Sequence, residues 1–166
     1  MVRALNWNDR VKPSLDHIID LFGNDELGAY ITGHLIIESV LVQLIELKIT
    51  EDDTFDPFEL SFPSKVRLAK NRGLIDESMA AFLIEMNRIR NRLAHRLGEP
   101  ITFDMVFNLA NAAAAGGVEF SDGNIHDEKN AREWYGTKAI IQEIFQNASQ
   151  DLSFIMEEHG GEFQFA

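Results

Sequence analysis

The chain has 166 residues, of which 45% are hydrophobic and 25% charged, a size and composition that suit one globular domain. It contains no cysteine, which excludes disulfides, thiolate catalysis and cysteine-ligated metal sites. Its formal charge of −12 argues against broad, non-specific binding to nucleic acid, because polyphosphate repels a net anion. We expect a cytoplasmic protein without a membrane partner, since residues 1–7 do not resemble a secretory signal and no apolar run reaches the length of a membrane span.

The basic residues are unevenly distributed. Residues 65–96 hold eight of the 15 lysines and arginines but three acidic residues. This segment is either a solvated basic face balanced by an acidic remainder, or a local anion site on a body that otherwise repels phosphate. The sequence leaves both interpretations open.

The first half of the chain predicts three helices. Apolar residues recur at helical spacing from Val11 to Phe22, and a second helix is predicted over residues 26–48, before an acidic loop at 50–56. Ser64 is the predicted N-cap of a short basic helix that ends at Gly73.

The second half predicts further helices and one uncertain segment. A long helix over residues 76–97 is followed by a helix that Thr102 caps and by a last helix over 128–158, interrupted near Gly136. Residues 118–126 form either a loop or a small hairpin around Ser-Asp-Gly-Asn.

The predicted fold class is therefore all-α, with five to six helices. Residues 1–159 are expected to form a single helical domain, and residues 160–166 a frayed C-terminal tail.

Arg90 occupies an unexpected position on the 76–97 helix. A helical wheel places it in the centre of the apolar arc, between Met79 and Leu83, although a guanidinium keeps its charge and needs a partner when buried. Glu38, on a buried-looking stripe of the second helix, is one candidate partner. The alternative is that Glu38 is a core residue satisfied by a local hydrogen bond.

The opposite face of the same helix combines polar, basic and apolar side chains, a mixture typical of a face that packs against another subunit. We therefore expect a homodimer. The residues on this face are His95, Asn91, Arg88, Arg92, Ile84 and Ala81.

The segment Arg90-Asn91-Arg92-Leu93-Ala94-His95 resembles the signature of the HEPN superfamily, an arginine with a polar residue beside it and a histidine four to six residues further on. The surrounding segments 62–69, 73–75 and 89–95 are similar to the mannitol operon repressor family and related HEPN-like domains. The similarity covers about residues 27–97, and it implies an antiparallel HEPN-like bundle.

The resemblance implies one of two functions. The first is a non-enzymatic regulatory or interaction protein of the mannitol operon repressor kind, with a protein partner. The second is a metal-independent endoribonuclease of the toxin or defence type, which cleaves single-stranded RNA at a dimer cleft and has an antitoxin as its partner.

In the enzyme, Arg90, Asn91 and His95 are the catalytic candidates. Histidine transfers protons near neutral pH, arginine stabilises the phosphorane charge, and asparagine holds a phosphate oxygen or orients the imidazole. The candidates for binding RNA or supporting the site are Arg88, Arg92, Arg96 and Glu38. We expect no cofactor and no metal.

Overall fold

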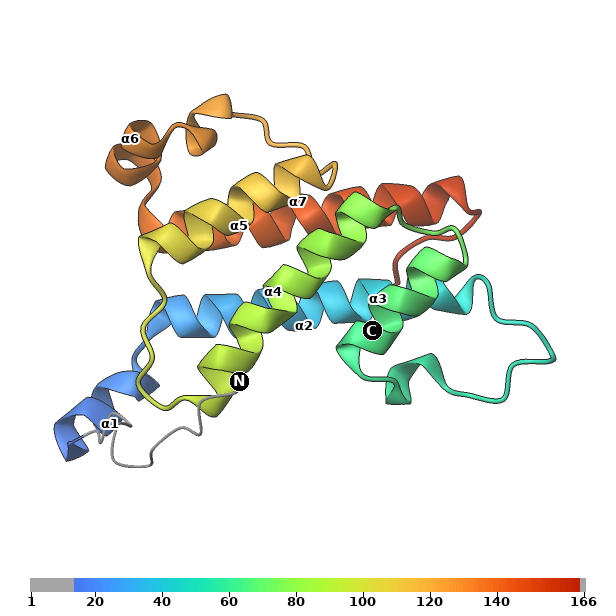
Figure 1. The fold of residues 1–166 in the computed structure, drawn as a ribbon, viewed down its shortest axis with the longest axis horizontal. Coiled ribbons are helices and arrows are strands. Elements are labelled where there is room, and N and C mark those ends of the chain that lie inside the picture. Colours follow the sequence, from blue (N-terminus) through green and yellow to red (C-terminus); the bar gives the residue numbers. More distant parts are fainter. Residues whose placement is uncertain (1–13, 165–166) are drawn as a thin grey trace, which may run out of the picture.

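The structure is a computed structural model that describes residues 14–164, and the described residues form helices and loops without a strand (Figure 1). Six α-helices have eight or more residues, which confirms the all-α fold class. They are α1 (Leu15–Phe22), α2 (Asp25–Glu46), α3 (Phe62–Asn71), α4 (Glu77–His95), α5 (Phe103–Ala115) and α7 (Gly136–Glu158). The predicted start of the first helix at Val11 lies outside the described residues.

Side-chain caps set where these helices begin. Thr102 caps α5 as predicted, since its hydroxyl accepts a hydrogen bond from the Met105 backbone N–H at 3.2 Å. The predicted N-cap of the basic helix, Ser64, is wrong: Ser61 caps α3 and accepts from the Ser64 N–H at 3.3 Å. The helix begins earlier because Pro63 fits the first helical turn, where no intrahelical N–H bond is lost.

The long helices do not simply alternate in direction. Lys138 in the first turn of α7 lies 3.4 Å from Asp25 at the start of α2, and Gly161 after α7 lies against Leu47 after α2, so these two helices run the same way. Helix α4 runs against α2, because Met79 in its first turn lines the same pocket as Ile155 near the end of α7, and Gly98 beyond its last turn lies against His17, which precedes α2 (Figure 1). The antiparallel arrangement therefore holds for α4 against α2, and not for the α2–α7 pair.

The hydrophobic core is centred on the contact between α2 and α7. Gly33 of α2 faces the ring of Phe145 so closely that an added Cβ would lie 2.2 Å from Phe145 Cγ. Tyr30 packs edge-on against the same ring at 5.0 Å and donates a hydrogen bond of 2.8 Å to the Met86 carbonyl of α4. Burial raises the pKa of Tyr30 well above its usual range, so the hydroxyl remains a donor. The contacts around Tyr30 thus join α2, α4 and α7.

The segment between α5 and α7 contains no hairpin. Residues 123–126 form a 3-10 helix capped by Asp122, α6 spans Glu128–Asn130, and a π-helix covers Ala131–Tyr135. The Tyr135 hydroxyl donates to Asp122 at 2.6 Å, and this bond raises the pKa of Tyr135 to about 12. The predicted interruption of the last helix is confirmed, because Gly136 has a φ of +74°.

Residues 160–164 lie against α2 instead of forming a frayed tail. The side-chain amide of Gln43 donates to the Gln164 carbonyl and accepts from the Gln164 N–H, both at 2.8 Å. Gly161 fits against Leu47, where an added Cβ would lie 2.6 Å from Leu47 Cδ1. The expectation of a frayed end overlooked this side-chain clamp.

By length and composition, helix α2 is long and apolar enough to cross a membrane, which corrects the expectation that no apolar run reaches that length. Half of its apolar window is buried inside the protein, including Tyr30, Ile37 and Leu41. In this structure the apolar character of α2 belongs to a core helix that is covered on several sides by other helices.

The close approach at Gly33 can be tested with two glycine substitutions in the same helix. Gly33→Ala is expected to lower the free energy of unfolding by about 1–3 kcal/mol, because its methyl group overlaps Phe145. Gly28→Ala, which meets no atom within 4 Å, is the matched control and should raise stability by about 0.5–1 kcal/mol through helix propensity. Urea denaturation measures both; equal effects would mean that α2 and α7 are further apart.

Candidate functional site on helix α4

The C-terminal end of α4 is only partly covered by the core. Leu93 is buried, whereas Ala94 and Leu97 are exposed, so the apolar arc of the helical wheel is not covered along its whole length. The chain then passes through Gly98, which approaches His17 of α1, and on to α5. The C-terminal end of α4 is therefore accessible on more than one side.

An open groove of about 420 Å³ follows the outer face of this end of α4. Asn87, Asn91 and His95, spaced four residues apart, form one polar row along it. Among residues 14–164, its lining comprises Ile84, Asn87, Arg88, Asn91, Arg92, His95 and Arg96. The structure therefore brings together five of the predicted site residues.

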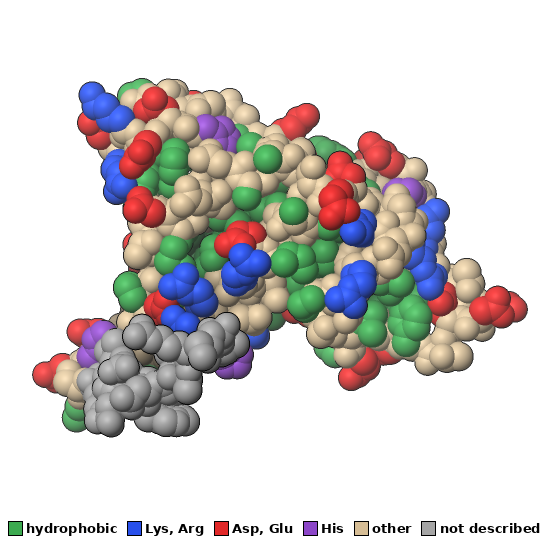
Figure 2. All heavy atoms as spheres, in the orientation of Figure 1, with side chains coloured by type: hydrophobic (Ala, Val, Ile, Leu, Met, Phe, Trp, Pro, Cys, Tyr) green, Lys and Arg blue, Asp and Glu red, His purple; other side chains and the backbone are tan. Residues whose placement is uncertain are grey.

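The three arginines of this groove already form ion pairs with acidic side chains. Arg88 lies 2.7 Å from Glu85, Arg92 Nε donates to Glu99 at 3.0 Å, and Arg96 lies 3.4 Å from the same carboxylate. Figure 2 shows basic and acidic side chains interspersed on the face of the molecule that it displays. With two carboxylates held against three arginines, the groove carries much less positive charge than its sequence suggests.

Arg90 is half-buried and is not paired with a carboxylate within residues 14–164. Its Nη1 donates to Asn91 Oδ1 at 3.3 Å, and the side chain does not line the groove. Glu38 is therefore not the partner of Arg90, which was one of the two interpretations that the sequence left open. The prediction assumed that other helices bury the apolar arc of α4 along its whole length, whereas the C-terminal end of α4, where Arg90 lies, is partly exposed.

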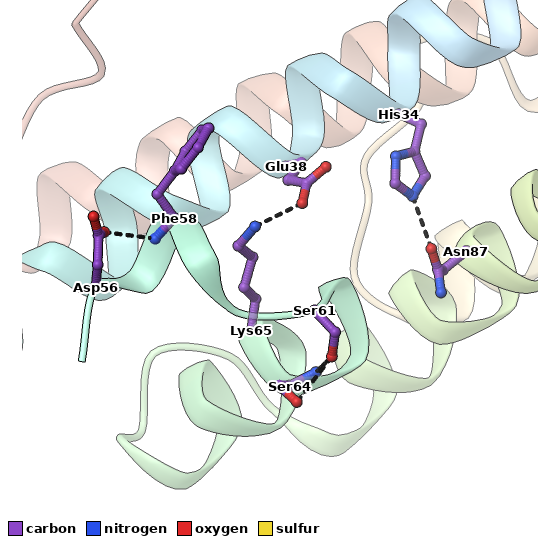
Figure 3. A network of polar contacts seen from close by, with 8 residues as sticks. All are labelled: His34, Glu38, Asp56, Phe58, Ser61, Ser64, Lys65 and Asn87. Carbon is purple, nitrogen blue, oxygen red and sulfur yellow. Dashed lines mark hydrogen bonds and ion pairs between the residues drawn. The ribbon is translucent and has the colours of Figure 1, made fainter.

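Glu38 instead neutralises Lys65, with Nζ and Oε1 2.6 Å apart (Figure 3). The lysine side chain is 3% exposed and the glutamate 28%, and the Phe58 ring lies 5.8 Å from the ammonium group. The sequence held a signal for this pair: Lys65 falls three residues after Phe62 and four before Ala69, on the apolar face of α3. A lysine in that position requires an acidic partner.

A second buried polar contact joins α2 to α4. His34 Nε2 lies 3.1 Å from Asn87 Oδ1, and the imidazole packs against the Phe62 ring at a centroid distance of 4.5 Å (Figure 3). Burial lowers the pKa of His34, and the charges of Arg90 and Lys65 lower it further, against opposing effects of Asn87 and Glu38. Asn87 thus connects the floor of the groove to the core, a role that the sequence did not reveal.

Comparisons of this chain with protein-family models, with curated proteins and with solved structures find no match. The functional argument therefore rests on the residues of α4 and their surroundings.

The two polar environments predict different costs of substitution. Glu38→Gln leaves the buried Lys65 ammonium opposite a neutral amide and should lower the free energy of unfolding by about 3 kcal/mol. Arg90→Ala removes a half-buried side chain without a carboxylate partner and should cost at most about 1 kcal/mol. Chemical denaturation of both variants tests this order, and a larger loss for Arg90→Ala would contradict the assigned ion pair.

Proposed function

We propose that the chain is a non-enzymatic regulatory or interaction protein with a HEPN-like bundle, of the mannitol operon repressor kind, acting in the cytoplasm. The observation that supports this proposal is the neutralisation of the groove: Glu85 and Glu99 hold the arginines that would otherwise bind phosphate. An incoming phosphate has to displace these carboxylates, whereas a protein surface with mixed charges can exchange ion pairs with them.

The same face of α4 is the proposed homodimer interface. Ala81 is exposed and Ile84 half-buried, and with Arg88 they form one side of the helix at spacings of three and four residues. A two-fold axis would place this face against its own copy, so that each contact occurs twice. The neutralised arginines reduce the repulsion between two such basic faces.

The dimer can be tested by its mass in solution. Light scattering at micromolar concentration should give about twice the chain mass of 18.8 kDa. Ala81→Arg adds a positive charge to the interface with little loss of helix propensity and should shift the protein toward a monomer. Ala114→Arg, at an exposed position of α5, is the matched control and should leave the mass unchanged. A wild-type monomer at all concentrations would refute the proposed interface.

The second candidate function is the metal-independent endoribonuclease. It is favoured by the placement of Asn91 and His95 in one groove, with the Arg90 guanidinium reaching Asn91. His95 is exposed and lies in the last turn of α4, where it can meet a substrate. One groove holds one imidazole, so a cleavage reaction that needs both a general base and a general acid would require two copies.

Cleavage of single-stranded RNA in EDTA separates the two candidate functions. The regulatory protein should leave the RNA intact under all conditions, and His95→Ala should affect partner binding only. The endoribonuclease should release a 2′,3′-cyclic phosphate, leave DNA uncut for want of a 2′-hydroxyl, and lose about 10²–10⁴-fold in rate on His95→Ala. Circular dichroism of the variant confirms folding. RNA cleavage that His95→Ala abolishes would overturn the non-enzymatic proposal.

A further inference from the structure

A second and larger groove lies away from the α4 face, along the side of α2. It has a volume of about 1040 Å³ and is bounded by α2, by the 3-10 helix η2 (Pro57–Glu59) and by residues 160–164. Its apolar lining consists of Leu35, Val42, Leu47, Phe58 and Met156. The function proposed above makes no use of this groove.

Two of these apolar side chains are exposed to an unusual degree. Phe58 is 70% exposed and Leu35 57%, although Val42 and Met156 beneath them are buried. The groove therefore has an apolar floor and apolar rims. Large exposed side chains gathered around a concave surface are typical of a site that contacts another molecule.

The groove follows α2 for about three turns. Leu35, Ser39, Val42 and Glu46 succeed one another at spacings of four, three and four residues, which corresponds to about 17 Å along the helix axis. The small side chain of Ser39 lies in the middle of this row. A helix of another molecule, about three turns long and with an apolar stripe, would match the length and shape of this groove.

The far wall of the groove is fixed in place. Gln43 binds both backbone groups of Gln164, and Gly161 packs against Leu47. The opposite end is also fixed, because the Phe58 ring lies over the Lys65 ammonium and the Phe58 N–H donates to Asp56 at 2.9 Å (Figure 3). A groove with both walls bonded to the body of the protein needs little ordering before it binds a partner.

The charge of the groove indicates the chemistry of that partner. Among the described residues, its lining contains three glutamates and no lysine, arginine or histidine. Glu38 is neutralised by Lys65, whereas Glu46 and Glu162 form no ion pair within the described residues. The whole chain carries a charge of −12, so a second copy would bring more repulsion, and a basic segment would bring attraction.

We propose that this groove docks a basic amphipathic helix of another protein, about three turns long. Its apolar stripe contacts Leu35, Val42 and Phe58, and its flanking lysines or arginines pair with Glu46 and Glu162. The α4 face and this groove are separate surfaces, so that the protein can hold this helix while the α4 face is occupied.

The test uses a fluorescently labelled synthetic helix of 14 residues with leucines on one face and lysines on the other, titrated with the full chain. We expect saturable binding that Phe58→Ser and Leu35→Ser each weaken at least tenfold. Both side chains are exposed, so both variants should stay folded, with a small loss of stability for Phe58→Ser because its ring contacts Lys65. Trp134→Ser, at a 61% exposed residue outside the groove, is the matched control and should bind as the wild type does.

Two further measurements decide between occupants. A control peptide with the same lysines, but with serine in place of leucine, should not bind. Equal binding of this peptide, or an equal loss on Trp134→Ser, would show general attraction to an acidic surface and would overturn the proposal. Self-association of the chain alone that Phe58→Ser abolishes would also overturn it, because a second copy would then fill the groove.

Discussion

Helices α2 and α7 meet at Gly33, where the ring of Phe145 fills the space that a side chain would otherwise occupy. This contact lets Tyr30 reach both the Phe145 ring and the Met86 carbonyl, so that α4 is attached to the α2–α7 pair by a hydrogen bond as well as by apolar packing. The position of α4 determines the direction of its outer face. The groove at Asn87, Asn91 and His95 therefore depends on a glycine that lies far from it in the sequence.

Two buried polar pairs fix how the neighbouring helices are aligned along α2. Glu38–Lys65 joins α2 to α3, and His34–Asn87 joins α2 to α4. The hydrophobic effect is non-directional, whereas a displaced polar pair would leave buried donors and acceptors without partners. These two pairs therefore fix the register of α3 and α4 along α2, and with it the position of the motif residues at the end of α4.

Apart from the cap of α3, which is Ser61 and not Ser64, the sequence was sufficient to predict the helices, because periodic apolar residues and side-chain caps act locally. Thr102 and Gly136 are examples, since a cap and a positive φ need no knowledge of distant residues. The partner of Glu38 could not be derived from a single helical wheel. A wheel shows which side of one helix is apolar, but not where the neighbouring helix ends, and the exposed end of α4 left Arg90 half-covered. The role of Asn87 likewise depends on its contact with His34, 53 residues away.

The shared direction of α2 and α7 has a consequence for how the chain acquires its structure. Asp25 and Lys138 are separated by 113 positions, and Gln43 and Gln164 by 121, so the central helix pair closes across most of the sequence. Contacts at such separation form slowly, because a long loop must be closed before they contribute any stability. During synthesis, α2 leaves the ribosome long before α7 does. In the nascent chain, the face of α2 that contains Gly33 and that α7 covers therefore stays exposed until α7 has been synthesised, although the folded protein buries it.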